Sequence, residues 1–262
     1  MKRALATCAV LAFFLGPFGW QVLTSLWPEN ELTRPFPHAL TLASYAGLGA
    51  SFGRALVNSL VVAAGTTALC LAVGSTAAFA IARLRFPGRR LLLGAALAIS
   101  MFPPIATVSP LYLALRALGF RDQLAGLVLP YATFALPITL WLLTSFFRAL
   151  PEELYRAARV DGCTPWQAFL RIYLPLAAPA LATTAILIFI FSWNELLYAL
   201  TFLSTPAKRT IPVAIALFAG EHTEPWGEIA AASVAATLPL AVLTLLFQRR
   251  IVSGLTAGAV KE

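Results

Sequence analysis

The segment RALVNSLVVAAGTTALCLAVGSTAAFAIA (residues 54–82) begins with one charged residue, Arg54, and continues for 28 residues without another. A helix of ~20 residues, rising ~1.5 Å per residue, crosses the ~30 Å hydrocarbon core of a bilayer. This run is therefore long enough and apolar enough to span a membrane. The whole chain has the same character: 60% of its 262 residues are hydrophobic and 11% are charged, against ~25% charged in an average soluble domain. The sequence predicts an integral membrane protein.

Six apolar runs meet this length requirement, at roughly 4–26, 54–82, 91–117, 124–147, 175–203 and 228–247. Each must be helical, because a lipid-exposed backbone has no other way to pair its amide groups. We therefore expect a single domain over residues 1–262, an all-α integral membrane protein with six transmembrane helices. Pro103 and Pro104 interrupt the third run, and broken helices often border a substrate path.

Lys and Arg residues are divided unevenly between alternate loops. If the N-terminus is cytoplasmic, 13 basic residues lie on the cytoplasmic side and 6 lie outside. Basic loops are retained in the cytoplasm, so this division predicts a multi-pass protein of the inner or plasma membrane with both termini cytoplasmic. The net charge of +8 is then a topology signal, and we expect no nucleic-acid partner and a lipid environment.

A polar segment, residues 150–174, separates the fourth and fifth runs. Two short helices are predicted in it, with a turn at Gly162, a residue that suits the left-handed cap at a helix end. Thr164 and Gln167 form a capping-box pattern at the start of the second helix. An amphipathic linker on the lipid surface is the alternative, but two caps around a tight turn favour a rigid hairpin. On the predicted topology this hairpin faces the cytoplasm.

The residues LPEELYRAARVDGCTPWQAFLRIYLPLAAP (150–179) resemble the EAA loop of the membrane subunits of ATP-binding-cassette importers. In that family the hairpin is a coupling helix that docks in a groove of the ATPase subunit. The match runs through Ala157, Ala158, Asp161, Gly162, Ile172, Leu174 and Pro175. The resemblance implies ATPase-coupling roles for Glu152, Glu153, Arg156, Ala157, Ala158, Asp161, Gly162 and Cys163.

Two positions depart from the family pattern. Arg156 stands where relatives carry glutamate, and Cys163 stands where they carry alanine. The first change reverses a charge at the expected ATPase contact, where Glu152 or Glu153 offers an alternative carboxylate.

Further segments resemble the carbohydrate class of these permeases, among them ALVNSLVVAAGTT (55–67), AAFAIARLRFPGRR (77–90), FSWNELLYAL (191–200) and FQRRIVSGLTAGAVKE (247–262). The chain is most similar to the second membrane subunit of maltose- and trehalose-type importers. This implies a path for a di- or oligosaccharide such as trehalose or maltose-type glucosides. The implied partners are a homologous second permease, two ATPase subunits and an extracytoplasmic sugar-binding protein. It also implies that a C-terminal tail contacts the ATPase subunits through Gly254, Leu255, Thr256 and Gly258.

No phosphate-binding loop exists in this chain, because none of its three lysines, Lys2, Lys208 and Lys261, follows a glycine. ATP and Mg are therefore expected on partner ATPase subunits. We expect this chain to be non-catalytic, with no bound cofactor, no catalytic residue and no metal site.

One polar pair, Asn194 and Glu195, lies deep in the fifth run, beside Trp193 and Tyr198. A carboxylate within the membrane is costly and indicates function by default, and aromatic rings beside hydrogen-bonding groups suit a sugar. These four residues are therefore candidates for the substrate path, as lining or as a gate. Interhelical hydrogen bonding, or a glutamate hydrated near the outer end, remains the alternative.

Two other classes of protein fit the composition. An ion-gradient-driven secondary transporter predicts paired membrane carboxylates or internal repeats, whereas this chain has one such carboxylate and no clear repeat. A membrane enzyme predicts a cluster of nucleophile, base or metal ligands, and the sequence shows none.

Overall fold

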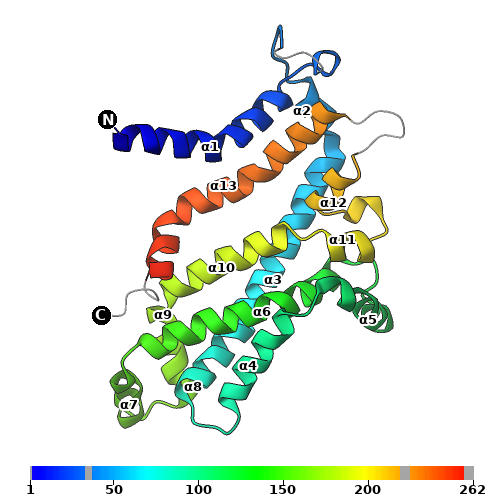
Figure 1. Cartoon of the computed structure of the whole chain (residues 1–262). Coiled ribbons are helices and arrows are strands. Elements are labelled where there is room, and N and C mark those ends of the chain that lie inside the picture. Colours follow the sequence, from blue (N-terminus) through cyan, green and yellow to red (C-terminus); the bar gives the residue numbers. More distant parts are fainter. Residues whose placement is uncertain (1, 33–36, 219–224, 257–262) are drawn as a thin grey trace.

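The chain folds into an elongated bundle of helices that carries a separate helical hairpin at one end (Figure 1). The computed structural model describes residues 2–32, 37–218 and 225–256, and every regular element within these ranges is helical. The first half comprises α1 (Lys2–Ser25), η1 (Glu29–Glu31), α2 (Ala43–Gly47), α3 (Gly49–Arg83), α4 (Arg89–Ser100), α5 (Pro104–Ala117) and α6 (Leu124–Ala149). The second half comprises α7 (Glu152–Val160), α8 (Pro165–Ala168), the π-helical turn η2 (Phe169–Tyr173), α9 (Leu174–Leu176), α10 (Ala178–Trp193), α11 (Leu197–Phe202), η3 (Pro206–Lys208), α12 (Ile211–Ala216) and α13 (Trp226–Thr256).

Four helices, α1, α3, α6 and α13, are each long and apolar enough to cross a membrane. Two further spans are counted if each of two bent helix pairs is taken as one span, which brings the number to six. The pair α4 and α5 bends by 100° at the break before Pro104, where a proline removes a backbone donor and cannot continue the preceding helix. The run 91–117 is thus divided into two helices at Pro103 and Pro104, where an interruption was expected.

The expected run 175–203 is also divided. Its first residues belong to a short helix, α9, which follows α8 and η2, and the chain bends by 77° before α10 begins at Ala178. A second break follows Trp193, after which the short helix α11 begins at Leu197. With 16 residues, α10 is ~24 Å long and shorter than the hydrocarbon core.

The centre of the bundle is built around α3 and α6, which contact each other along their length, with α10 packed against both. Small residues allow this close approach. A Cβ atom at Gly74 of α3 would lie 2.5 Å from Thr139 Cγ2 of α6, so only glycine fits that contact. At Gly65, earlier on the same helix, a Cβ atom would lie 3.3 Å from Val128 Cγ2 of α6.

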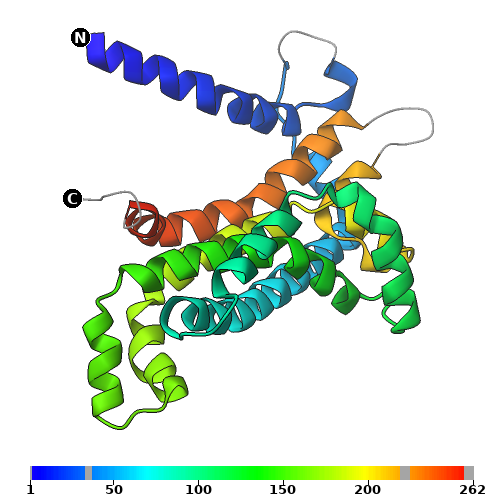
Figure 2. The ribbon, with the colours of Figure 1, turned by 60° about the horizontal axis from the view of Figure 1, so that its bottom comes forward.

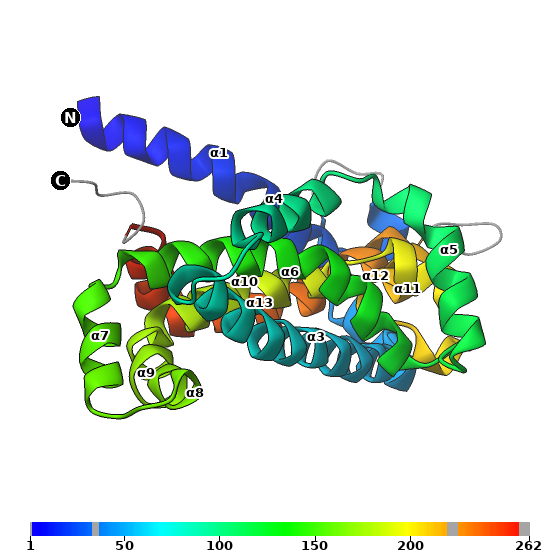
Figure 3. The ribbon, with the colours of Figure 1, turned by 90° about the horizontal axis from the view of Figure 1, so that it is seen from below.

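The first helix, α1, lies at the side of the bundle and contacts α13. Figure 2 shows it projecting away from the other helices, and its large side chains, such as Phe13 and Phe14, are exposed. The far end of α1 is held by a hydrogen bond of 2.8 Å between Ser25 Oγ and the hydroxyl of Tyr45. Viewed from below, α1 begins and α13 ends toward the same end of the bundle as α7 (Figure 3).

Candidate functional site

The hairpin is formed by α7 and the run of α8, η2 and α9, joined by a turn at Gly162. Gly162 has φ +80°, the left-handed conformation expected for it. The amide of Cys163 donates to the carbonyl of Ala158 at 2.9 Å, which closes the first helix. The predicted capping box is also present: Gln167 N donates to Thr164 Oγ1 at 3.2 Å, and Thr164 N donates to Gln167 Oε1 at 2.8 Å. Local hydrogen bonds therefore fix the turn from both sides.

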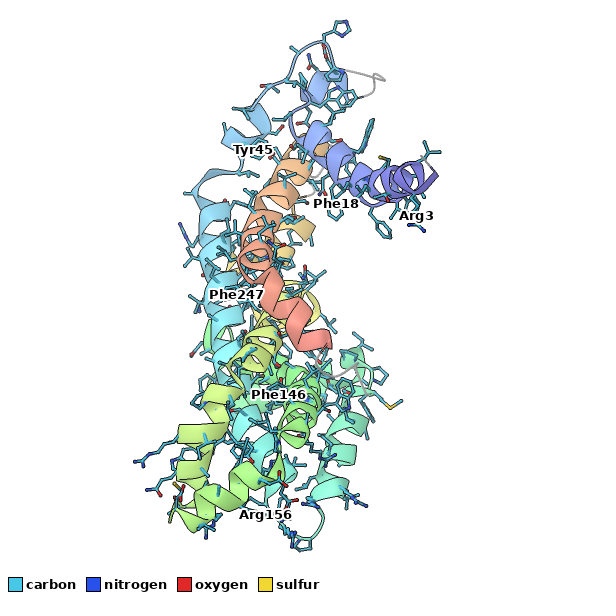
Figure 4. All side chains as sticks on the ribbon, turned by 90° about the vertical axis from the view of Figure 1, so that its left-hand side faces the viewer. Arg3, Phe18, Tyr45, Phe146, Arg156 and Phe247 are labelled. Atoms are coloured by element: carbon cyan, nitrogen blue, oxygen red, sulfur yellow. The ribbon has the colours of Figure 1, made fainter. Side chains whose placement is uncertain are left out.

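The predicted coupling residues lie close together on this hairpin. Ala158 is buried and Cys163 is partly buried, whereas the remaining members are exposed: Glu152, Glu153, Arg156, Ala157, Asp161 and Gly162. Figure 4 shows Arg156 at the end of the molecule far from Tyr45. A surface so placed is free to meet another subunit.

Arg156, where the resemblance to the EAA loop predicts a glutamate, is paired within its own helix. Its Nη2 atom lies 3.1 Å from Glu152 Oε1, one turn earlier, and Arg85 Nη2 approaches the same oxygen at 3.9 Å. Both partners are largely exposed, so these ion pairs add little stability. Glu152 is thus engaged by two arginines, while Glu153 is exposed beside it.

Two exposed apolar side chains near the turn were missed by the reasoning from sequence. Val160 is 86% exposed at the end of α7, and Trp166 is 57% exposed in α8. The available signal was an apolar residue directly before the Asp161-Gly162 turn of an otherwise polar helix. Apolar and aromatic side chains form the core of protein interfaces, and polar residues surround them as a rim.

Aromatic rings attach the hairpin to the bundle. Phe79 of α3 lies at the centre, with ring centroids 5.0 Å from Tyr173, 5.2 Å from Phe169, and 6.1 Å from both Phe147 and Tyr155. These rings come from α6, α7 and η2, so a single side chain of α3 contacts both arms of the hairpin and the helix that leads into it. Such clusters of rings are well packed and stiff.

The candidate path residues surround the break between α10 and α11. Asn194 is exposed and donates to the carbonyl of Ile190 at 2.8 Å. The carboxylate of Glu195 accepts from the amides of Tyr198 at 3.0 Å and Ala199 at 3.3 Å. Glu195 therefore satisfies the otherwise unpaired amides at the start of α11, which accounts for a carboxylate at this depth.

Tyr198 joins this break to the break between α4 and α5. Its hydroxyl lies 2.6 Å from Thr107 Oγ1 and donates to the carbonyl of Pro104 at 3.1 Å. Its ring stacks on Phe134 of α6, with centroids 5.8 Å apart. The fourth candidate, Trp193, is buried and stacks on Phe189 at 5.7 Å. The two interrupted spans thus meet at one buried tyrosine.

A hollow of about 700 Å³ opens at the end of the bundle away from the hairpin. The four path residues do not line it; its charged lining comes from Arg54, Arg209 and Glu228. Among the described parts of the chain, no group of three or more His, Cys, Asp or Glu side chains is placed to hold a metal ion.

Near this hollow, Asp122 connects the turn after α5 to the loop after α11. It accepts from Thr205 Oγ1 at 2.6 Å and from the amides of Ser204 and Thr205 at 2.9 and 3.1 Å. Lys208 Nζ lies 3.4 Å from its Oδ2 atom and also donates to its backbone carbonyl. The hydroxyl and amide of Thr205, with the amide of Ser204 and with Lys208, hold the pKa of this carboxyl well below its usual range.

The predicted tail contacts fall at the edge of what the structure describes. Gly254, Leu255 and Thr256 form the end of α13, and their side chains are outside the described set, as is all of Gly258.

Comparison with known proteins shows the family to which the chain belongs. Residues 70–256 match the family model described as "Binding-protein-dependent transport system inner membrane component". The chain is 48% identical to the trehalose transport system permease protein SugB of Mycobacterium tuberculosis, covering 98% of this chain and 96% of that protein. It is 41% identical to the trehalose/maltose transport system permease protein MalG of Thermococcus litoralis, covering 97% and 93%.

Its fold also matches a solved structure. A chain of a bacterial ABC transporter that imports the acidic polysaccharide alginate superposes with a TM-score of 0.81 over 95% of this chain and 94% of that one, at 21% identity. Family match, near-full-length relatives and shared fold agree. The chain belongs to the family of inner membrane components of binding-protein-dependent transport systems.

Proposed function

We propose that this chain is a permease subunit of an ATP-driven sugar importer, that it forms half of the translocation path, and that its hairpin couples this path to ATPase subunits. The proposal rests mainly on the hairpin, which is capped on both sides of its turn and whose predicted coupling residues are mostly exposed at the end of the bundle. Family membership already excludes the alternative of an ion-gradient-driven secondary transporter.

The class of sugar is proposed from the relatives. Besides the two trehalose permeases, they include the sulfoquinovosyl glycerol permease SmoH of Agrobacterium fabrum, at 43% identity, and the diacetylchitobiose permease DasC of Streptomyces coelicolor, at 34%. These names cover sugars of one or two rings. Among these four relatives, the trehalose permease SugB has the highest identity, at 48%, which favours trehalose or a maltose-type glucoside as cargo.

The proposed assembly contains a homologous second permease, two ATPase subunits that bind ATP and Mg, and an extracytoplasmic sugar-binding protein. The hairpin and both termini face the cytoplasm, in line with the basic residues and with the end of the bundle at which α1 begins, α13 ends and α7 lies (Figure 3). The segments 27–53 and 204–227, which include the short helices α2 and α12, are the proposed contacts with the binding protein. Gly254, Leu255, Thr256 and Gly258 are the proposed contacts of the C-terminal tail with the ATPase subunits.

Transport follows from two arrangements of the same bundle. When ATP closes the ATPase subunits, the hairpins move with them and favour the outward-facing arrangement. Trp193, Asn194, Glu195 and Tyr198 lie where two interrupted spans meet. Their proposed role is to hold or release this junction and thereby to border the path.

The turn of the hairpin gives a direct experiment. Proline cannot adopt the positive φ of Gly162, so Gly162→Pro should distort the hairpin and release the ATPase subunits during purification from membranes. Gly119→Pro is the matched control, because Gly119 has a similar φ of +76° and lies between α5 and α6. The control should retain the ATPase subunits. Retained assembly and sugar uptake in Gly162→Pro would argue against the proposed docking.

A further inference from the structure

We infer that α3 is the link between the hairpin and the loop at the opposite end of the bundle, with Arg83 and Asn58 as the positioning residues at its two ends. The inference rests on the proposed function of the hairpin and goes beyond it by naming how its movement reaches the other side. With 35 residues, α3 is ~52 Å long and exceeds the ~30 Å hydrocarbon core. It is therefore long enough to connect the two faces of the membrane.

At the hairpin end, Arg83 contacts both stems of the hairpin. It lies in the last turn of α3, and its guanidinium donates to the carbonyls of Phe147 and Leu150, at the end of α6 and directly before α7. The last carbonyls of a helix lack partners within the helix and carry partial negative charge, so a cation there is favoured. The same guanidinium lies over the ring of Tyr173, 5.2 Å from its centroid, where the chain leaves the hairpin.

At the other end, Asn58 and Ser59 hold the loop that leads into α12. Asn58 Nδ2 donates to the carbonyls of Ala207 and Arg209, both at 2.9 Å, and Ser59 Oγ accepts from the amide of Ile211 at 2.8 Å. Both side chains are buried. These hydrogen bonds join residues that are 149 to 152 positions apart in the sequence, and they fix the loop to α3.

Between these ends, α3 is suited to transmit a displacement. Asn58 and Arg83 are 25 residues apart (83 minus 58), or ~37 Å along the helix. The helix contains no proline, whereas α6 contains Pro130 and Pro137 and the neighbouring spans α4–α5 and α10–α11 are interrupted. A movement of the hairpin stems is therefore carried along α3 to residues 207–211, beside the hollow that opens at that end.

The test uses the complete importer in lipid nanodiscs, with trehalose-loaded binding protein as the probe. ATP hydrolysis is measured with and without that protein, and the amount of bound ATPase subunit is measured in parallel. Arg83→Gln removes the charge, and Asn58→Leu removes both donors. Each variant should keep the ATPase subunits, but the stimulation of ATP hydrolysis by the binding protein should fall at least about fivefold. A factor of about five is at the lower end of the coupling seen between distant sites. Arg90→Gln, at an exposed arginine of the same end, is the control and should behave as wild type.

The double variant decides whether one link is involved. If α3 carries a single signal, Arg83→Gln together with Asn58→Leu should reduce stimulation little more than either change alone. Multiplied effects would show two separate local defects and overturn the inference. Should Arg83→Gln fail to assemble, Asn58→Leu alone still tests the link, and full stimulation in that variant would also overturn the inference. Wild-type complex that loaded binding protein does not stimulate would instead contradict the proposed function.

Discussion

The hydroxyl of Tyr198 lies 2.6 Å from Thr107 Oγ1, so that α11 and α5, the helices that follow the two breaks, are joined by a side-chain hydrogen bond. The residues are 91 positions apart in the sequence. The same hydroxyl reaches the carbonyl of Pro104, at the first residue of α5. This contact makes the junction of the interrupted spans a defined structural unit.

Removing the hydroxyl tests that junction. Tyr198→Phe keeps the ring on Phe134 but leaves Thr107 and the Pro104 carbonyl without this partner, at a cost of ~1 kcal/mol. We expect a lower melting temperature in detergent and altered uptake by the reconstituted importer. Tyr112→Phe is the control, since the hydroxyl of Tyr112 makes no hydrogen bond to the described residues. Equal melting temperatures for both variants would contradict the role of the contact.

Val160 tests the docking surface without disturbing the fold. Because its side chain is 86% exposed, Val160→Asp should leave the melting temperature of the chain unchanged. A residue central to an interface contributes ~2 kcal/mol, so affinity for the ATPase subunits should fall ~30-fold. Leu118→Asp, at an exposed apolar residue of the opposite end, should leave that affinity intact. Unchanged affinity in Val160→Asp would exclude this part of the hairpin from the interface.

The carboxylate of Asp122 should make the stability of the folded chain depend on pH. Its pKa in the folded protein is lowered, so its stabilising effect is present above the ordinary pKa of ~3.9 and is lost as the pH falls through the lower folded value. Asp122→Asn should therefore melt at a lower temperature than wild type at pH 7 and pH 5. The difference should shrink below pH ~4 and vanish in stronger acid.

Asparagine also tolerates the positive φ of 53° at this position, so the substitution tests the charge and not the backbone. Asp161→Asn, at an exposed carboxylate of the hairpin, is the control and should melt as wild type does at each pH. If the difference in melting temperature between Asp122→Asn and wild type increased as the pH fell, the stabilising role of the ionised Asp122 carboxylate would be contradicted.

Gly74 tests the contact between α3 and α6. A methyl group there would lie 2.5 Å from Thr139 Cγ2, and Gly74→Ala should destabilise the chain by ~1–3 kcal/mol. Adding Thr139→Ser removes that methyl group and should restore most of the loss. On the same helix, a Cβ atom at Gly53 would have no neighbour within 4 Å, so Gly53→Ala should be neutral or stabilising. Thermal unfolding in detergent compares all three.

Local features were predictable from the sequence because their partners lie within a few residues. The left-handed Gly162 and the reciprocal bonds of Thr164 and Gln167 depend only on the turn itself. The interruption at Pro104 follows from the chemistry of proline. The membrane class followed from composition, and the family from the pattern of the hairpin.

The contacts that position the candidate site were not predictable, because they join distant segments. Nothing local indicates that Arg83 reaches carbonyls 64 and 67 residues later, or that Tyr198 meets Thr107. Glu195 shows the opposite case: its depth in an apolar run indicated a path residue, yet its carboxylate is bonded to the backbone of α11. The break that makes such a cap necessary was not predicted, although the polar pair Asn194 and Glu195 marks its position in the apolar run.

In the proposed function, ATP hydrolysis by partner subunits drives sugar through a path formed in part by this chain. The direct measurement is uptake of labelled trehalose into proteoliposomes that contain the complete importer, with loaded binding protein outside and nucleotide inside. We expect uptake with ATP, none with a non-hydrolysable analogue, and no effect of collapsing the ion gradients; the opposite pattern would contradict an ATP-driven importer. Uptake that persists with the analogue while an ion gradient is intact would contradict it.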